Sequence, residues 1–154
     1  MESAMRKLMP ALLFLIFLAG SSGAAFGDFE QKVSIVGRWQ FYKKIYHGQE
    51  MPEGPEATLR LFYEFSPNGE SHLWWWHEGD RDHCSRKGYY QIKDGFLEER
   101  VFWVDPQNSI DCSSDPDMQP HRFTRTPIFF LGEDFALQFH LGEDELDLVW
   151  KRLL

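Results

Sequence analysis

Short segments of alternating apolar and polar residues fill the sequence beyond Gly27, and glycine-containing turns separate them. No window in this part holds the helical 3.6-residue apolar period, so the segments are predicted to be strands. Asn68-Gly69 and Asp94-Gly95 are the strongest hairpin signals, because two-residue turns need positive φ angles. The predicted strands cover residues 35–46, 58–65, 70–77, 88–93, 96–104, 123–131, 135–141 and 146–152. Consecutive hairpins favour an all-β fold, a single up-and-down antiparallel β-barrel of about eight strands, since closure removes exposed edges.

The N-terminal stretch has the order of residues that is typical of a secretory signal peptide. Arg6 and Lys7 precede an apolar run over residues 8–18, and small residues follow up to Ala25. The run is shorter than the about 20 residues that span a bilayer, although a retained N-terminal anchor stays the alternative. We therefore expect residues 1–25 to be a cleaved signal peptide and residues 26–154 to be the barrel domain.

The same stretch indicates where the protein goes. Ser21 stands where a bacterial lipoprotein would carry its lipidated cysteine, so no lipid anchor is expected there. The mature protein is expected to be periplasmic or secreted, without a membrane span.

Length and charge limit the number of domains and the class of partner. A length of 154 residues is typical of a single domain. The formal net charge of -8 and the pI near 5.2 argue against nucleic acid and against an anionic membrane surface as the main partner.

Export favours a disulfide between the two cysteines, Cys84 and Cys112. An even pair in an oxidising compartment is most simply one bond. Closing a loop of this length stabilises a fold by about 3–4 kcal/mol in the loop-entropy account. The alternative is metal ligation together with His77 or His83, for which two cysteines are few.

The last hairpin has one apolar face and one polar face. A four-residue loop over residues 142–145 predicts three core pairs: Leu141 with Leu146, Phe139 with Leu148, and Leu137 with Trp150. The opposite face would hold Ala136, Gln138, His140, Asp147, Val149 and Lys151. Arg152 then falls on the core side.

The first strand offers that arginine a partner. Its inward residues are predicted to be Ile35, Gly37, Trp39 and Phe41, and its outward residues Arg38, Gln40 and Lys44. If the first and last strands pair, as closure requires, Trp39 and Arg152 meet at the floor of the barrel. A guanidinium over an indole is worth about 0.5–2 kcal/mol.

These features resemble the lipocalins. Gly37-Arg38-Trp39 resembles the Gly-X-Trp signature that opens the first lipocalin strand, and Arg152 resembles the arginine that lipocalins pack across that tryptophan. Too few residues follow the last predicted strand for the lipocalin helix, and the usual middle-loop motif is not evident. The chain is therefore most similar to a short bacterial-type lipocalin-like (calycin) domain. The resemblance implies a barrel that binds a small apolar or amphipathic molecule.

The second hairpin predicts the binding site. An even-length loop around Asn68-Gly69 turns Trp74 and Trp76 inward, near Tyr63. The same register turns Trp75 outward beside Phe62, as a possible contact with a protein partner. The predicted ligand-binding residues are Tyr63, Trp74, Trp76, Glu99 and Phe139.

Glu99 enters this list as a polar anchor. The Asp94-Gly95 turn pairs Ile92 with Leu97 and Tyr90 with Glu99, on a face that also holds Val101 and Trp103. If that face is inward, a carboxylate sits in the lumen and needs a partner. The opposite register would instead put Glu98 and Arg100 inside.

The remaining chemistry-bearing residues give no catalytic signature. His77 and His83 flank a turn with acidic neighbours, and four aspartates crowd the segment after the fifth strand: Asp105, Asp111, Asp115 and Asp117. Zinc and calcium sites are the alternatives to a polar turn and an acidic loop, but the ordered ligand spacing of either site is missing. We expect no enzyme activity, cofactor or metal.

Two functions of different classes remain open. The first is a carrier of a small apolar or amphipathic molecule, which needs a cavity with an open mouth. The second is a barrel filled with side chains that acts through its surface, as an inhibitor or an envelope interaction protein. An enzyme ranks third, behind both of these functions.

Overall fold

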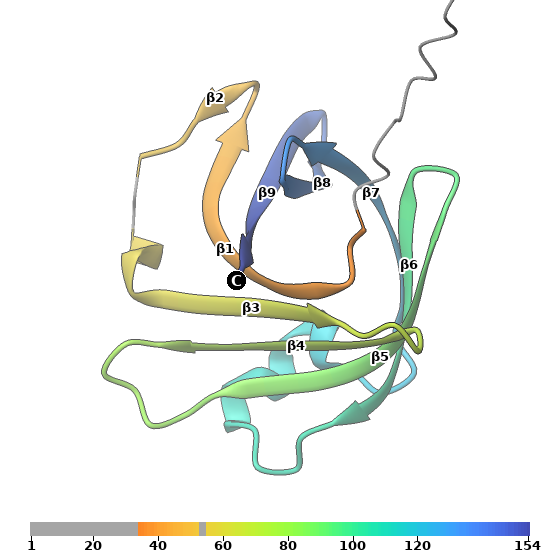
Figure 1. The fold of residues 1–154 in the computed structure, drawn as a ribbon. Helices are drawn as coiled ribbons and strands as arrows, with labels where there is room; N and C mark the ends of the chain where they lie inside the picture. Colours follow the sequence, from red (N-terminus) through yellow and green to blue (C-terminus); the bar gives the residue numbers. More distant parts are fainter. Residues whose placement is uncertain (1–33, 53–54) are drawn as a thin grey trace, which may run out of the picture. The chain divides into compact units, whose positions relative to one another are not determined.

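A computed structural model describes residues 34–52 and 55–154 (Figure 1). The predicted signal peptide, residues 1–25, lies outside the described residues. The strands are β1 (Gly37–Tyr46), β2 (Gln49–Glu50), β3 (Leu59–Phe65), β4 (Glu70–His77), β5 (Cys84–Lys93), β6 (Phe96–Val104), β7 (Phe123–Leu131), β8 (Asp134–Leu141) and β9 (Asp144–Leu153). Three short 3-10 turns complete the elements: η1 (Pro55–Thr58), η2 (Ile110–Ser114) and η3 (Pro116–Met118).

Eight of these strands form a closed antiparallel barrel. Neighbours along the chain pair in the order β1, β3, β4 and on to β9, and β9 returns to pair with β1 (Figure 1). The short β2 pairs only with the end of β1. The predicted up-and-down barrel is therefore confirmed. Within the two described ranges, no helix is long and apolar enough to cross a membrane.

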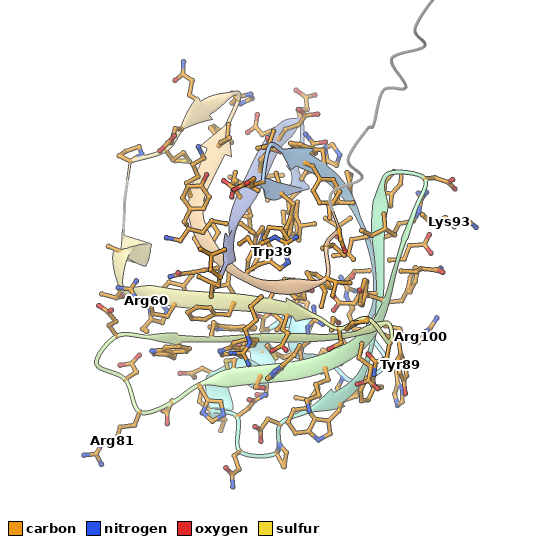
Figure 2. All side chains as sticks on the ribbon, viewed as in Figure 1. Trp39, Arg60, Arg81, Tyr89, Lys93 and Arg100 are labelled. Atoms are coloured by element: carbon orange, nitrogen blue, oxygen red, sulfur yellow. A yellow bond between two sulfur atoms is a disulfide. The ribbon has the colours of Figure 1, made fainter. Side chains whose placement is uncertain are left out.

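Trp39 and Arg152 close one end of the barrel, as predicted. They are register partners, and the Arg152 guanidinium carbon lies 4.3 Å from the centre of the Trp39 ring. Trp39 is fully buried inside the barrel (Figure 2) and donates its indole N–H to the Ile35 carbonyl at 2.6 Å. Gly37 has a φ of +138°, which favours glycine, and a Cβ there would lie 2.7 Å from Arg152 Nη1, so a side chain at this position would be strained and would displace the guanidinium.

The last hairpin keeps the predicted inner and outer residues but not the predicted register, and two residues of its outer face, Ala136 and Val149, are buried where a wet face was expected. Leu141 pairs with Asp144, so the loop has two residues, Gly142 and Glu143, instead of four. Phe139 therefore faces Leu146, and Phe135 faces Trp150. A shift of two residues preserves the alternation of faces, which is why Arg152 still lies on the core side.

The hairpin between β3 and β4 corrects a prediction. Ser66 and Glu70 pair around a three-residue loop, in which Gly69 has a φ of +84° and donates to the Ser66 carbonyl at 3.1 Å. Three-residue hairpin loops of this kind pair odd residues with odd ones, whereas the prediction assumed an even loop. Phe62 therefore pairs with Trp74, and Leu61 pairs with Trp75.

Two β-bulges reverse the faces of the residues beyond them, so the faces predicted for Lys44 and Trp103 are wrong. The β1–β9 register shifts between Phe41 and Lys43, so that Lys44 pairs with Leu148 on the inner face instead of pointing outward. The β5–β6 register shifts beside Gly88, and Trp103 becomes an outer residue with Lys87 over its ring at 5.4 Å. A bulge inserts one residue into one strand and so reverses the faces beyond it.

Candidate functional site

A cavity of about 360 Å³ enters the barrel at the end away from Trp39. Its wall is mainly apolar, with leucines, threonines and aromatic rings from six strands. The residues that line it are Leu59, Leu61, Tyr63, Leu73, Trp75, His77, Arg86, Leu97, Glu99, Asp115, Asp117, Thr124, Thr126, Leu137, Phe139, Leu148 and Trp150. Tyr63 and Trp150 are buried at its floor, whereas His77 is exposed at its rim. A pocket of this size and polarity is within the range for small-molecule sites.

Packed aromatic rings fill the closed half of the barrel, below the cavity. Phe135 lies edge-on to Trp39, with 4.8 Å between ring centres, and stacks on Trp150 at 5.8 Å. Toward the other end, aliphatic and small residues such as Leu61, Leu148 and Thr126 line the cavity between the rings of Trp75 and Phe139. An eight-stranded barrel with such an end has space for one small ligand.

The predicted site residues divide into two groups. Tyr63, Glu99 and Phe139 line the cavity, as the sequence indicated. Trp74 and Trp76 do not, because the three-residue loop of the β3–β4 hairpin reverses that face of β4. The prediction that both tryptophans point inward is wrong, and Trp75, expected on the surface, takes their place in the cavity wall.

Trp74 and Trp76 instead form an aromatic ladder on the outside of the barrel. Phe62 stacks on both indoles, with ring centres 5.4 Å from Trp74 and 5.3 Å from Trp76. His72 continues the row at 4.6 Å from Trp74. All four side chains are partly exposed. We call Phe62, His72, Trp74 and Trp76 the outer aromatic ladder.

Glu99 is the centre of a buried polar cluster in the cavity wall. Tyr63 donates its hydroxyl to Glu99 Oε2 at 2.5 Å, and Arg86 donates from Nη2 to the same oxygen at 2.9 Å. Ser71 donates to Glu99 Oε1. Gly88 makes room for this carboxylate, since a Cβ there would lie 3.2 Å from it. Glu99 therefore has three hydrogen-bond partners, whereas the sequence analysis required at least one.

Arg86 is less well satisfied than its partner. Its side chain is 4% exposed, and Nη2 bonds to Glu99 and, at 3.2 Å, to the Tyr63 hydroxyl. Its other two nitrogens, Nε and Nη1, are buried and have no hydrogen-bond partner among the described residues. Burial and the nearby charge of Glu99 raise the pKa of Tyr63 well above its usual value, so Tyr63 stays a neutral donor.

The segment between β6 and β7 brings acidic groups to the same cavity. Cys112 in η2 forms the predicted disulfide with Cys84 at the start of β5. Asn108 adds two bonds to the Ser85 backbone, at 2.7 and 3.0 Å. These links hold Asp115 and Asp117 at the cavity wall. Burial raises the pKa of Asp117, and the charge of Arg86 lowers it in part.

Ser71, Trp75, Arg86 and Asp117 are among the residues of this site that the sequence analysis did not assign to it. Arg86 was missed because the strand that forms β5 was predicted to begin at Gly88, four residues after its actual start at Cys84. An isolated glycine inside a strand pattern, such as Gly88, is itself a signal of close packing. The missing side chain of Gly88 leaves the space that the Glu99 carboxylate fills.

The two histidines near the rim, His77 and His83, have different partners. His83 Nε2 is 3.5 Å from Asp105, and His77 shares a hydrogen bond with Thr58. Among the residues that the structure describes, no three His, Cys, Asp or Glu side chains come together as a metal site.

No family model and no curated protein matches the sequence. Among solved structures, the chain is similar to a lipocalin-like protein from Bacteroides uniformis, with 15% sequence identity and a TM-score of 0.49. The match covers 77% of this chain and 97% of that one. By its own geometry the fold is an eight-stranded up-and-down antiparallel barrel that closes between β1 and β9, with Arg152 stacked on Trp39 at the closed end.

Proposed function

We propose that this protein is an exported binding protein that holds one small apolar or amphipathic molecule inside its barrel. The open cavity of about 360 Å³ carries the proposal, because its wall is mainly apolar and a few polar groups meet at one place. The role is binding without catalysis. Glu99, the most buried carboxylate of the cavity, already accepts three hydrogen bonds and so is a poor candidate for a general base.

Displacement of an apolar fluorescent probe tests the proposal. The probe is expected to bind in the micromolar range and to quench tryptophan emission. Trp75 and Trp74 are neighbours on β4 that face opposite sides of the wall, so they provide a matched pair. Trp75→Ala should weaken binding by about tenfold, since it removes a large apolar contact. Trp74→Ala should leave the affinity unchanged, and equal effects of both variants would contradict a site inside the barrel.

Export is a second part of the proposal. The basic, apolar and small segments of the N-terminus support it, as does the disulfide, since such bonds persist in oxidising compartments. N-terminal sequencing of the protein from its host is expected to begin at Ala25 or Phe26. Recovery of a chain that still begins at Met1 or Met5 would contradict cleavage.

Recognition of a protein partner is a second candidate function, and the outer aromatic ladder favours it. Rigid, partly exposed aromatic rings are typical anchors of protein interfaces. A photo-crosslinking residue in place of Trp76 should give a protein adduct in the host compartment. The same residue in place of Lys151, on the outside of β9, serves as the control. Similar adducts from both positions would contradict a role for the ladder.

A further inference from the structure

The polar cluster of the cavity has buried donors that its own acceptors leave unsatisfied. Glu99 receives bonds from Tyr63, Ser71 and Arg86, so each of its oxygens already accepts at least one bond. Arg86 keeps two buried nitrogens, Nε and Nη1, without a partner among the described residues. A buried donor without a partner is destabilising. An acceptor brought by the ligand against Arg86 would relieve this cost.

The charges around that position decide which acceptor fits. Arg86 and Glu99 form an ion pair of 2.9 Å and neutralise each other. Asp115 and Asp117 line the same cavity and add only negative charge, while His77 lies at the exposed rim. A ligand anion would thus enter a site whose one arginine is already paired. Burying it there would cost more than its attraction to Arg86 returns.

We propose that the cavity selects an uncharged molecule with a carbonyl-type acceptor on an apolar body, such as an amide, ester or ketone, over a fatty-acid anion. The carbonyl oxygen accepts a hydrogen bond from Arg86, and the apolar body lies among Leu61, Trp75 and Leu148. This inference rests on the proposed function and adds the polarity of the ligand to it.

Three ligands that share one chain length separate head-group preference from apolar binding. Decanamide, decanoate and decylamine are each used to displace the fluorescent probe from the mature protein near neutral pH. Decanamide is expected to displace the probe at a concentration about tenfold lower than decanoate, and lower than decylamine, whose ammonium group offers Arg86 no acceptor. Equal or tighter binding of decanoate or decylamine overturns the inference but supports the proposed function. Failure of all three ligands to bind contradicts both.

Variants of the acidic pair test the charge argument. Asp115→Asn/Asp117→Asn should tighten decanoate binding by about fivefold and leave decanamide within about twofold of the unmodified protein. Asp94→Asn removes a carboxylate from the exposed β5–β6 turn and is the matched control. An unchanged ratio of decanoate to decanamide affinity in the double variant overturns the role given to the acidic residues.

Arg86→Lys tests the acceptor. The substitution keeps a positive charge beside Glu99 but removes the planar fork of donors. Decanamide affinity should fall by about fivefold or more, while decylamine affinity changes little. An unchanged decanamide affinity would show that the carbonyl does not bind Arg86. Should Arg86→Lys fail to fold, the double asparagine variant and the three ligands still decide the inference.

Discussion

Two arginines lie beside aromatic rings inside this barrel, and they are satisfied in different ways. At the closed end, Arg152 covers Trp39 and donates to the backbone carbonyls of Ser34 and Val36. In the cavity wall, Arg86 lies 6.0 Å from the Tyr63 ring centre and leaves two nitrogens without partners. The first arrangement is complete without any ligand, whereas the second has unused donors. The comparison separates a site built for stability from a site that a ligand can complete.

Removing Arg86 should have the largest effect on stability, because it leaves Glu99 charged and buried. We expect Arg86→Met to lower the free energy of unfolding by about 3–5 kcal/mol. Arg86→Met/Glu99→Met should recover most of that loss, since no buried charge remains. Denaturant unfolding measures both variants. A loss of less than about 1 kcal/mol in Arg86→Met would mean that Arg86 contributes no more to stability than an exposed arginine does.

The disulfide should have the next largest effect, and it sharpens the comparison because it holds the acidic segment at the cavity. Cys84→Ala/Cys112→Ala is expected to cost about 3–4 kcal/mol by the loop-entropy account. The unmodified exported protein, denatured without reductant, should show no titratable thiols. Two free thiols in the exported protein would contradict the bond.

Arg152 should matter for stability but not for binding. Arg152→Ala is expected to cost about 1–3 kcal/mol, because Trp39 loses its cover and a cation–π contact. Lys151→Ala, on the outer face of β9, is the control. Probe affinity of folded Arg152→Ala should equal that of the unmodified protein. A denaturation midpoint shifted no more than in Lys151→Ala would remove the argument that this stack secures the closure.

The closed end was predictable because its signals are local. Gly37 and Trp39 follow strict alternation in one strand, and Arg152 stays on the core side under any even shift of the last hairpin. The actual shift was two residues, and the predicted stack survived it. The β5–β6 turn was predicted equally well, because Asp94 and Gly95 both have positive φ angles and fix the pairing of Tyr90 with Glu99.

The cavity wall was less predictable because its registers depend on single residues. Pro67, Asn68 and Gly69 form a three-residue loop, and one residue more or less reverses every side chain of β4. That change exchanged Trp75 for Trp74 and Trp76. The bulge that turned Trp103 outward lies beside Gly88, where β5 extends beyond its predicted start while β6 keeps its predicted bounds. A register error of one residue leaves the predicted number of strands and the predicted fold unchanged, but it changes which residues are assigned to the site.

The smallest effect concerns Asp117, which lies near the incomplete arginine. Burial raises the pKa of Asp117 above its ordinary value of 3.8. Between 3.8 and the raised value, the folded protein binds more protons than the unfolded chain, so the free energy of unfolding falls as the pH rises. Asp117→Asn imitates the protonated form. It should therefore be more stable than the unmodified protein at neutral pH, by less than about 1 kcal/mol since partial exposure screens the charge.

The pH dependence of the stability difference between Asp117→Asn and the unmodified protein shows whether the charged form of Asp117 stabilises or destabilises the fold. Below about pH 3.8 the carboxyl is neutral in both states, and the two proteins should unfold with the same free energy. Denaturant unfolding at several pH values measures the gap. An Asp117→Asn variant that is less stable at neutral pH would mean that charged Asp117 stabilises Arg86. The donors of Arg86 would then have a partner within the chain, and the contrast with Arg152 would disappear.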